Sequence, residues 1–94
     1  MKKIYISKNL KEKVPFDLLK EIYRIICALP APNTFHEFYL QSTESGLLLV
    51  HSIPNTNFRY SIEFSHSFGI NDTINIVAYD GKGKIIISLS SELK

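Results

Sequence analysis

The chain has 94 residues, which is enough for one domain, residues 1–94, and too few for two. Hydrophobic residues make up 45% and charged residues 21%, which argues against a disordered chain and is typical of a globular protein. The net charge of +2 is low for a nucleic-acid-binding protein. No apolar run approaches the roughly 20 residues of a membrane-spanning helix, and no signal-peptide pattern is visible in the first residues, so we expect none. Together with a single cysteine, Cys27, these features predict a cytoplasmic protein without membrane contact.

The N-terminal segment is basic and begins with a predicted strand. Residues 1–13 hold five lysines and one glutamate, a net charge of +4, whereas the rest of the chain carries −2. Lys3 to Ser7 alternates, with Ile4 and Ile6 on one face, and Asn9 to Lys13 is predicted to be a polar connection. Such a basic end either binds phosphate or an acidic partner protein, or forms an edge strand whose lysines prevent edge-to-edge association.

One amphipathic helix is predicted from Pro15 to Leu29, because proline suits the first turn of a helix. Its apolar residues recur at spacings of three and four and form a single stripe: Leu18, Leu19, Ile22, Ile25, Ile26 and Leu29. Lys20 and Arg24 lie on the opposite side, and Cys27, near the border of the stripe, is predicted to be a packing residue. The segment Pro30-Ala31-Pro32 is expected to end the helix.

Five further strands are predicted after the helix, separated by turn sequences: 35–43, 47–53, 58–65, 74–79 and 84–89. The most regular alternation places Phe58, Tyr60, Ile62 and Phe64 on one side, which indicates a strand with one buried and one wet face. Asp80-Gly81 between two alternating runs predicts a hairpin. The predicted fold class is therefore α+β: one curved antiparallel sheet of about six strands in a meander, with the helix packed on one face.

No motif for catalysis, a cofactor or a metal is apparent in the sequence. His36, His51 and His66 come from three different strand regions, so a metal site would require all three side chains to converge. Asp72 and Asp80 have complete explanations as turn residues, and no second carboxylate is placed beside either one. We therefore predict a non-enzymatic protein with no catalytic residues and no bound cofactor.

Too many apolar residues are present on the strands for one helix to cover. Seven of them are predicted to point away from the helix: Phe35, Tyr39, Leu48, Val50, Val77, Tyr79 and Ile86. An uncovered apolar face marks a binding site for another protein or a homodimer interface, unless the sheet curls enough to bury these residues itself. The predicted partner-binding residues are Tyr39, Val77 and Tyr79 on the sheet, with Lys20 and Arg24 on the helix.

Binding of single-stranded nucleic acid is the alternative hypothesis. Aromatic side chains flanked by cations on a sheet face form stacking platforms for bases. The cations that would serve this role are Lys3, Arg59, Lys82 and Lys84. The aromatic residues would be Tyr5, Tyr39, Tyr60 and Tyr79. Tyr60 is expected in the core rather than on such a platform, because it shares its side of the strand with apolar neighbours.

Several short segments also match a known family in the same order. They are Ile4-Tyr5-Ile6-Ser7, Val14-Pro15-Phe16-Asp17-Leu18, Tyr39-Leu40-Gln41 and Ile76-Val77-Ala78-Tyr79-Asp80-Gly81. In these pieces the chain resembles a family of small uncharacterised proteins, a domain of unknown function, of Gram-positive bacteria, their phages and mobile elements. It departs from the family at Val50-His51-Ser52-Ile53, where the family tends to have His-Arg-Gln. The resemblance implies a cytoplasmic, phage- or element-encoded protein and, by analogy, an inhibitor that binds a host defence protein.

Overall fold

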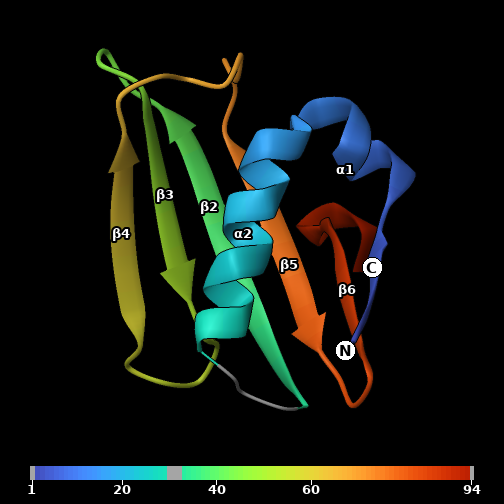
Figure 1. Ribbon diagram of the computed structural model, residues 1–94. Helices are drawn as coiled ribbons and strands as arrows, with labels where there is room; N and C mark the ends of the chain where they lie inside the picture. The colour runs from blue at the N-terminus through green and yellow to red at the C-terminus, as the bar shows by residue number, and fades with distance from the viewer. Residues whose placement is uncertain (1, 30–32, 94) are drawn as a thin grey trace.

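The computed structural model describes residues 2–29 and 33–93 and has the predicted α+β architecture (Figure 1). Its elements in chain order are β1 (Lys3–Ile6), α1 (Lys8–Lys13), α2 (Phe16–Ala28), β2 (Thr34–Ser42), β3 (Leu47–Ser52), β4 (Arg59–Phe64), β5 (Ile74–Asp80), β6 (Lys84–Leu89) and the 3-10 helix η1 (Ser90–Leu93). All six predicted strands are present, each within one residue of its expected bounds. Within the described ranges, no helix is long and apolar enough to cross a membrane.

The six strands form one mixed sheet in the order β1-β6-β5-β2-β3-β4. β2, β3 and β4 are successive antiparallel neighbours, but β5 returns to pair with β2 instead of β4, which gives a Greek-key arrangement. β1 pairs with β6 in parallel. The predicted purely antiparallel meander is therefore wrong in two places. Both pairings join segments that no short turn connects, so alternation along the chain carries no signal for them.

Burial of one helical stripe holds α2 on the sheet. The buried residues of this helix lie at spacings of three and four: Leu18, Leu19, Ile22 and Ile26. Burying an aliphatic side chain of this size contributes about 1.5–3 kcal/mol, so docking of α2 depends mainly on this stripe. Cys27 is exposed, so the packing role predicted for it is wrong. The helix ends at Ala28, and its predicted terminator, residues 30–32, lies outside the described residues.

A short helix, α1, replaces the polar connection predicted for Asn9 to Lys13. It begins after Ser7, whose hydroxyl oxygen accepts a hydrogen bond from the backbone N–H of Leu10 at 3.2 Å. Leu10 is fully buried, and Val14, four residues later, is buried beside it in the core. This helix was not predicted, because its sequence is rich in lysine and its apolar side contains Leu10 alone.

The apolar side of β4 is only partly covered. The register places Tyr60, Ile62 and Phe64 opposite the core residues His51, Leu49 and Leu47 of β3, on the side of α2. Because β4 is an edge strand, α2 does not extend over it fully, and Ile62 and Phe64 are half-buried. Tyr60 is 62% exposed, which corrects the expectation that it lies in the core.

Candidate partner-binding face

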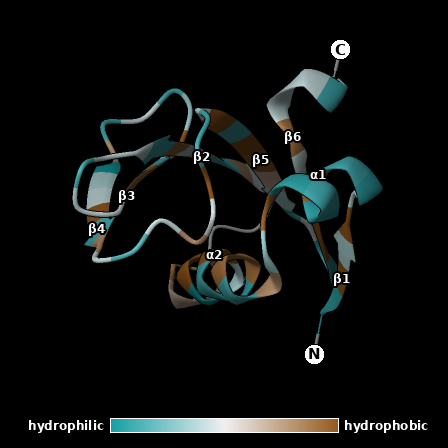
Figure 2. Ribbon diagram, turned by 90° about the horizontal axis from the view of Figure 1, so that it is seen from above, coloured by the Kyte–Doolittle hydropathy of each residue, from teal (hydrophilic) through white to brown (hydrophobic). Residues whose placement is uncertain are grey.

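On the face of the sheet opposite α2, none of the described residues forms a helix over the central strands (Figure 2). We call this face the open face. Its apolar residues are the seven predicted to point away from the helix, joined by Tyr5 of β1: Tyr5, Phe35, Tyr39, Leu48, Val50, Val77, Tyr79 and Ile86. Tyr5, Phe35 and Ile86 are 51%, 44% and 37% exposed. Val50 and Val77 are buried, so the sheet covers part of this face with its own side chains and leaves the rest accessible.

Four directly paired residues form a row across the open face, which we call the apolar row. Tyr5 pairs with Ile86, Ile86 with Tyr79, and Tyr79 with Phe35. Neighbouring strands are separated by about 4.8 Å, so the row extends over about 14 Å. The rings of Phe35 and Tyr79 contact each other, with centroids 5.0 Å apart and planes tilted by 53°. This arrangement is a packed aromatic pair within the row.

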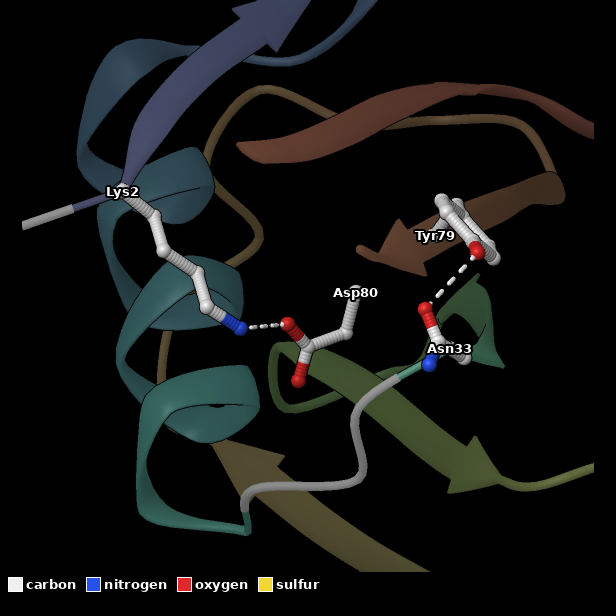
Figure 3. Close-up of polar contacts among 4 residues, drawn as sticks. All are labelled: Lys2, Asn33, Tyr79 and Asp80. Atoms are coloured by element: carbon white, nitrogen blue, oxygen red, sulfur yellow. Dashed lines mark hydrogen bonds and ion pairs between the residues drawn. The ribbon is translucent and has the colours of Figure 1, made fainter. Parts of the chain in front are cut away.

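The ring of Tyr79 is held by contacts with Asn33, Phe35 and the backbone of Gly81, and Figure 3 shows the contact with Asn33. Its hydroxyl donates a hydrogen bond to Oδ1 of Asn33 at 3.3 Å. Asn33 has a left-handed backbone with φ of 61°, which asparagine tolerates, and its N–H donates to the carbonyl oxygen of Asp80 at 2.6 Å. A Cβ on Gly81 would lie 2.7 Å from Cε2 of Tyr79, so the ring lies against the backbone of that glycine. Tyr79 is therefore a preorganised side chain and not a mobile surface residue.

An apolar depression of about 290 Å³ lies beside the apolar row. Its lining residues are Phe35, Val77, Tyr79, Ile86 and Ser88. Val77 and Ser88 are buried and form its floor, whereas the more exposed Phe35 and Ile86 form its rim. The volume is at the lower limit of small-molecule sites, so it suits one or two apolar side chains better than a cofactor.

Three lysines border the apolar row at the β5–β6 hairpin, and we call them the lysine corner. Lys3 and Lys84 are direct partners on β1 and β6, two residues from Tyr5 and Ile86, so they share the open face. Lys82 is exposed in the hairpin. Among residues 2–29 and 33–93, no ion pair involves these three side chains. The nearby Asp80 belongs to the opposite face, where it is buried and paired with the Lys2 ammonium (Figure 3).

The sheet residues predicted to bind a partner lie together on the open face, but not all in one depression. Val77 and Tyr79 line the apolar depression, whereas Tyr39 lines a neighbouring polar one of about 290 Å³ that also includes Glu37 and Arg59. The hydroxyl of Tyr39 donates to Oε1 of Gln41 at 3.2 Å.

The helix residues of the predicted set lie on the other side of the molecule. Lys20 and Arg24 belong to the exposed surface of α2, where Arg24 pairs with Glu21 at 3.3 Å and the Lys20 ammonium lies 5.7 Å from the ring of Phe16. One flat partner surface therefore cannot contact both groups at once.

The predicted nucleic-acid-binding cations are also separated. Lys3, Lys82 and Lys84 form the lysine corner, whereas Arg59 lies on β4, at the other edge of the sheet from β1. Tyr5, absent from the predicted partner-binding set, is the residue that connects the lysine corner to the apolar row. Its position follows from the parallel pairing of β1 with β6, which the strand pattern did not signal.

A buried histidine pair lies on the α2 side of the sheet. Nδ1 of His36 and Nε2 of His51 are 2.8 Å apart, so one ring donates a hydrogen bond to the other. Burial lowers the pKa of His36, although the nearby Asp80 carboxylate acts in the opposite direction. Burial, together with repulsion from His36, lowers the pKa of His51 to about 4. Both imidazoles are therefore neutral at pH 7.

The third histidine does not join this pair. His66 lies beyond the end of β4, and its ring contacts that of Phe68 at a centroid distance of 3.9 Å. Within the described part of the chain, no group of three or more His, Cys, Asp or Glu side chains is arranged to hold a metal ion.

Comparison with known proteins finds a solved structure with a similar fold. No protein-family model matches the chain, and no curated protein matches it. The chain is similar to a solved crystal structure, that of a protein of unknown function from Enterococcus faecalis, with a TM-score of 0.77 and 23% sequence identity. The similarity covers 97% of this chain and 90% of that one. At this level of identity, the similarity shows a shared fold alone.

Proposed function

We propose that this chain is a small, non-enzymatic binding protein that acts by protein–protein contact through the open face. The observation that carries the proposal is the apolar depression bordered by exposed Phe35 and Ile86. Accessible apolar surface of this kind is typical of a partner site. Because the ring of Tyr79 is already held by Asn33 and Phe35, it would lose little conformational entropy on binding.

The family resemblance motivates a narrower form of this proposal. In it, the chain is a cytoplasmic protein encoded by a phage or mobile element, and its partner is a host defence protein that it blocks. Self-association through the same face, giving a homodimer, is the alternative mode of contact.

Site-specific photo-crosslinking in cells tests the protein-binding proposal. The photoreactive residue benzoylphenylalanine is placed at Phe35 of the open face in one variant and at Phe16 of α2 in the other. Both positions are exposed aromatic residues, so the substitution is conservative in each. We expect a discrete protein adduct from Phe35, detected by mass shift and identified by mass spectrometry, and none from Phe16. Adduct yields that are equal at the two positions would refute the proposal.

The double substitution Tyr39→Ala with Tyr79→Ala supplies the loss-of-binding arm. Both side chains are partly exposed on the open face, so their removal should leave the core intact, which circular dichroism checks. We expect the Phe35 adduct to disappear in this background. Light scattering of the unmodified protein and of the double variant shows whether the lost partner was a second copy of the chain.

Single-stranded nucleic-acid binding is the second candidate function. It is favoured by the position of Lys3 and Lys84 beside Tyr5 on the open face, since cations next to exposed aromatic rings form base-stacking surfaces. A fluorescence-anisotropy titration with a single-stranded oligonucleotide at low salt tests it. Absence of binding at micromolar protein, or binding that does not weaken with salt, rules it out.

A further inference from the structure

The lysine corner carries unbalanced positive charge next to the apolar depression. Lys3 and Lys84 are direct partners on neighbouring strands, and like charges at directly opposed positions destabilise a sheet. None of the ion pairs in the described residues neutralises them, and Lys82 in the adjoining hairpin adds a third positive charge. A bound anionic group would relieve this repulsion.

We propose that the open face binds an acidic protein segment: an apolar side chain enters the depression, and neighbouring carboxylates contact Lys3, Lys82 and Lys84. This inference rests on the proposed function and specifies the partner's chemistry. The inference is based on charge complementarity, because the lysine corner is positively charged. The apolar row lies between this corner and the depression. In an extended segment, successive residues on one face are about 7 Å apart. An apolar residue in the depression and acidic residues a few positions away would therefore reach the depression and the lysine corner together.

The shape of the depression favours a side chain over a nucleic-acid base. The rings of Phe35 and Tyr79 are tilted by 53° and pack on each other, so they do not present two flat, separate stacking surfaces. The depression is lined by apolar side chains, by Ser88 and by Tyr79, whose hydroxyl is bonded to Asn33, and thus offers few groups that could bind the edge of a base.

A second copy of the chain fits the same surface less well. In a two-fold dimer the same patch of both copies meets, so packing along the apolar row would bring the two lysine corners to one interface. The acidic residues of the open face, Glu37 and Glu63, lie on β2 and β4, away from the corner on β1 and β6.

A display library of random linear peptides tests this proposal, followed by anisotropy titration of the selected peptides. We expect enrichment of sequences in which a leucine or aromatic residue lies near several aspartates or glutamates. The double substitution Lys3→Glu with Lys84→Glu should weaken binding of a selected peptide by roughly tenfold or more, because attraction becomes repulsion. The pair Lys20→Glu with Arg24→Glu changes the net charge equally on the far side of the molecule and should leave the affinity within about twofold.

Ile86→Ser supplies a test of the apolar contact that leaves the charge of the lysine corner unchanged. Ile86 is a rim residue of the depression and is 37% exposed, so the fold should survive, as circular dichroism would confirm. We expect loss of peptide binding. Selection of neutral or basic peptides, equal effects of the two charge-reversal pairs, or selective binding of an oligonucleotide instead of peptides would each overturn the proposal. A protein adduct from Phe35 combined with any of these results would leave the proposed function standing and reject the acidic partner alone.

Discussion

His36 and His51 place two titratable rings where water does not reach. Each is at most 2% exposed, and each satisfies part of its hydrogen-bonding capacity through the other. Nε2 of His36 has no hydrogen-bond partner among the described residues, so the pair is incompletely satisfied even when neutral. Protonation would add charge to this buried region. The pair therefore couples the stability of the fold to pH.

The fold should lose stability as the pH falls from about 6.5 towards 4. Histidine in the unfolded chain has a pKa near 6.5, whereas the folded pKa of His51 is about 4, so the unfolded state binds more protons in this range. The stability that neutral, buried His51 contributes is fully present above the pKa of histidine in the unfolded chain, near 6.5. At pH 5 we expect the free energy of unfolding to be about 2 kcal/mol lower than at pH 7 from His51 alone. Urea denaturation at the two pH values measures it.

Replacement of one histidine at a time isolates the contribution of the buried pair to the pH dependence of stability. His51→Gln retains polar atoms that can bond Nδ1 of His36 but removes the titration, so the difference in stability between pH 7 and pH 5 should shrink. His66→Gln is the matched control, because that exposed histidine lies outside the pair. An unchanged pH dependence in His51→Gln would show that other groups cause it.

At the scale of elements, alternation predicted the strands and the side of each residue, but not the partners of every strand. Tyr39, Val77 and Tyr79 were assigned to the open face because side-chain direction depends only on local backbone geometry. The pairing of β5 with β2 and of β1 with β6 depends on contacts between distant segments, and so Tyr5 was not placed in the partner-binding set. The depression itself depends on how three strands, β2, β5 and β6, align, which no single strand specifies.

The β2–β3 turn shows how closely these elements pack. A Cβ on Gly46 would overlap the carbonyl oxygen of Phe64 and lie 2.8 Å from the backbone nitrogen of His66. Both obstacles are backbone atoms and cannot rotate away. We therefore expect Gly46→Ala to lower the free energy of unfolding by about 3 kcal/mol, as measured by urea denaturation.

Gly69→Ala separates this steric effect from backbone strain. Gly69 has a φ of 76°, and a Cβ there would meet no atom within 4 Å. Gly69→Ala should therefore lower the free energy of unfolding by about 1 kcal/mol, which is the cost of placing alanine in the left-handed conformation. If Gly46→Ala costs no more than Gly69→Ala, the turn does not pack against β4 as described.

On the scale of the whole molecule, the two ends of the chain hold each other in place. β1 pairs with β6, and Glu92 of η1 accepts hydrogen bonds from the Ser7 hydroxyl at 2.7 Å and from Nδ2 of Asn9 at 3.3 Å. The bond from Ser7 and one from the N–H of Leu89 lower the pKa of Glu92. The lysine corner and Tyr5 lie on this β1–β6 unit, so the proposed binding surface depends on the contact between the ends.

Glu92→Ala should loosen the N-terminal segment without unfolding the sheet. β1 has a neighbour on one side only, whereas β2 is paired on both sides and its Phe38 and Leu40 are buried. Amides of β1 should therefore exchange through local opening and those of β2 through global unfolding. We expect native-state hydrogen exchange of β1 and α1 to become several-fold faster in the variant, with β2 unchanged.

Glu44→Ala is the matched control, because Glu44 is exposed in the β2–β3 turn, away from the chain ends. It should leave exchange in β1 and α1 as in the unmodified protein. Equal acceleration in β2 and β1 on replacement of Glu92 would mean that this glutamate stabilises the whole fold instead of the end-to-end contact. In the expected case, the same variant should also weaken binding of the selected acidic peptides, because Lys3 and Tyr5 would no longer be held beside Lys84 and Ile86.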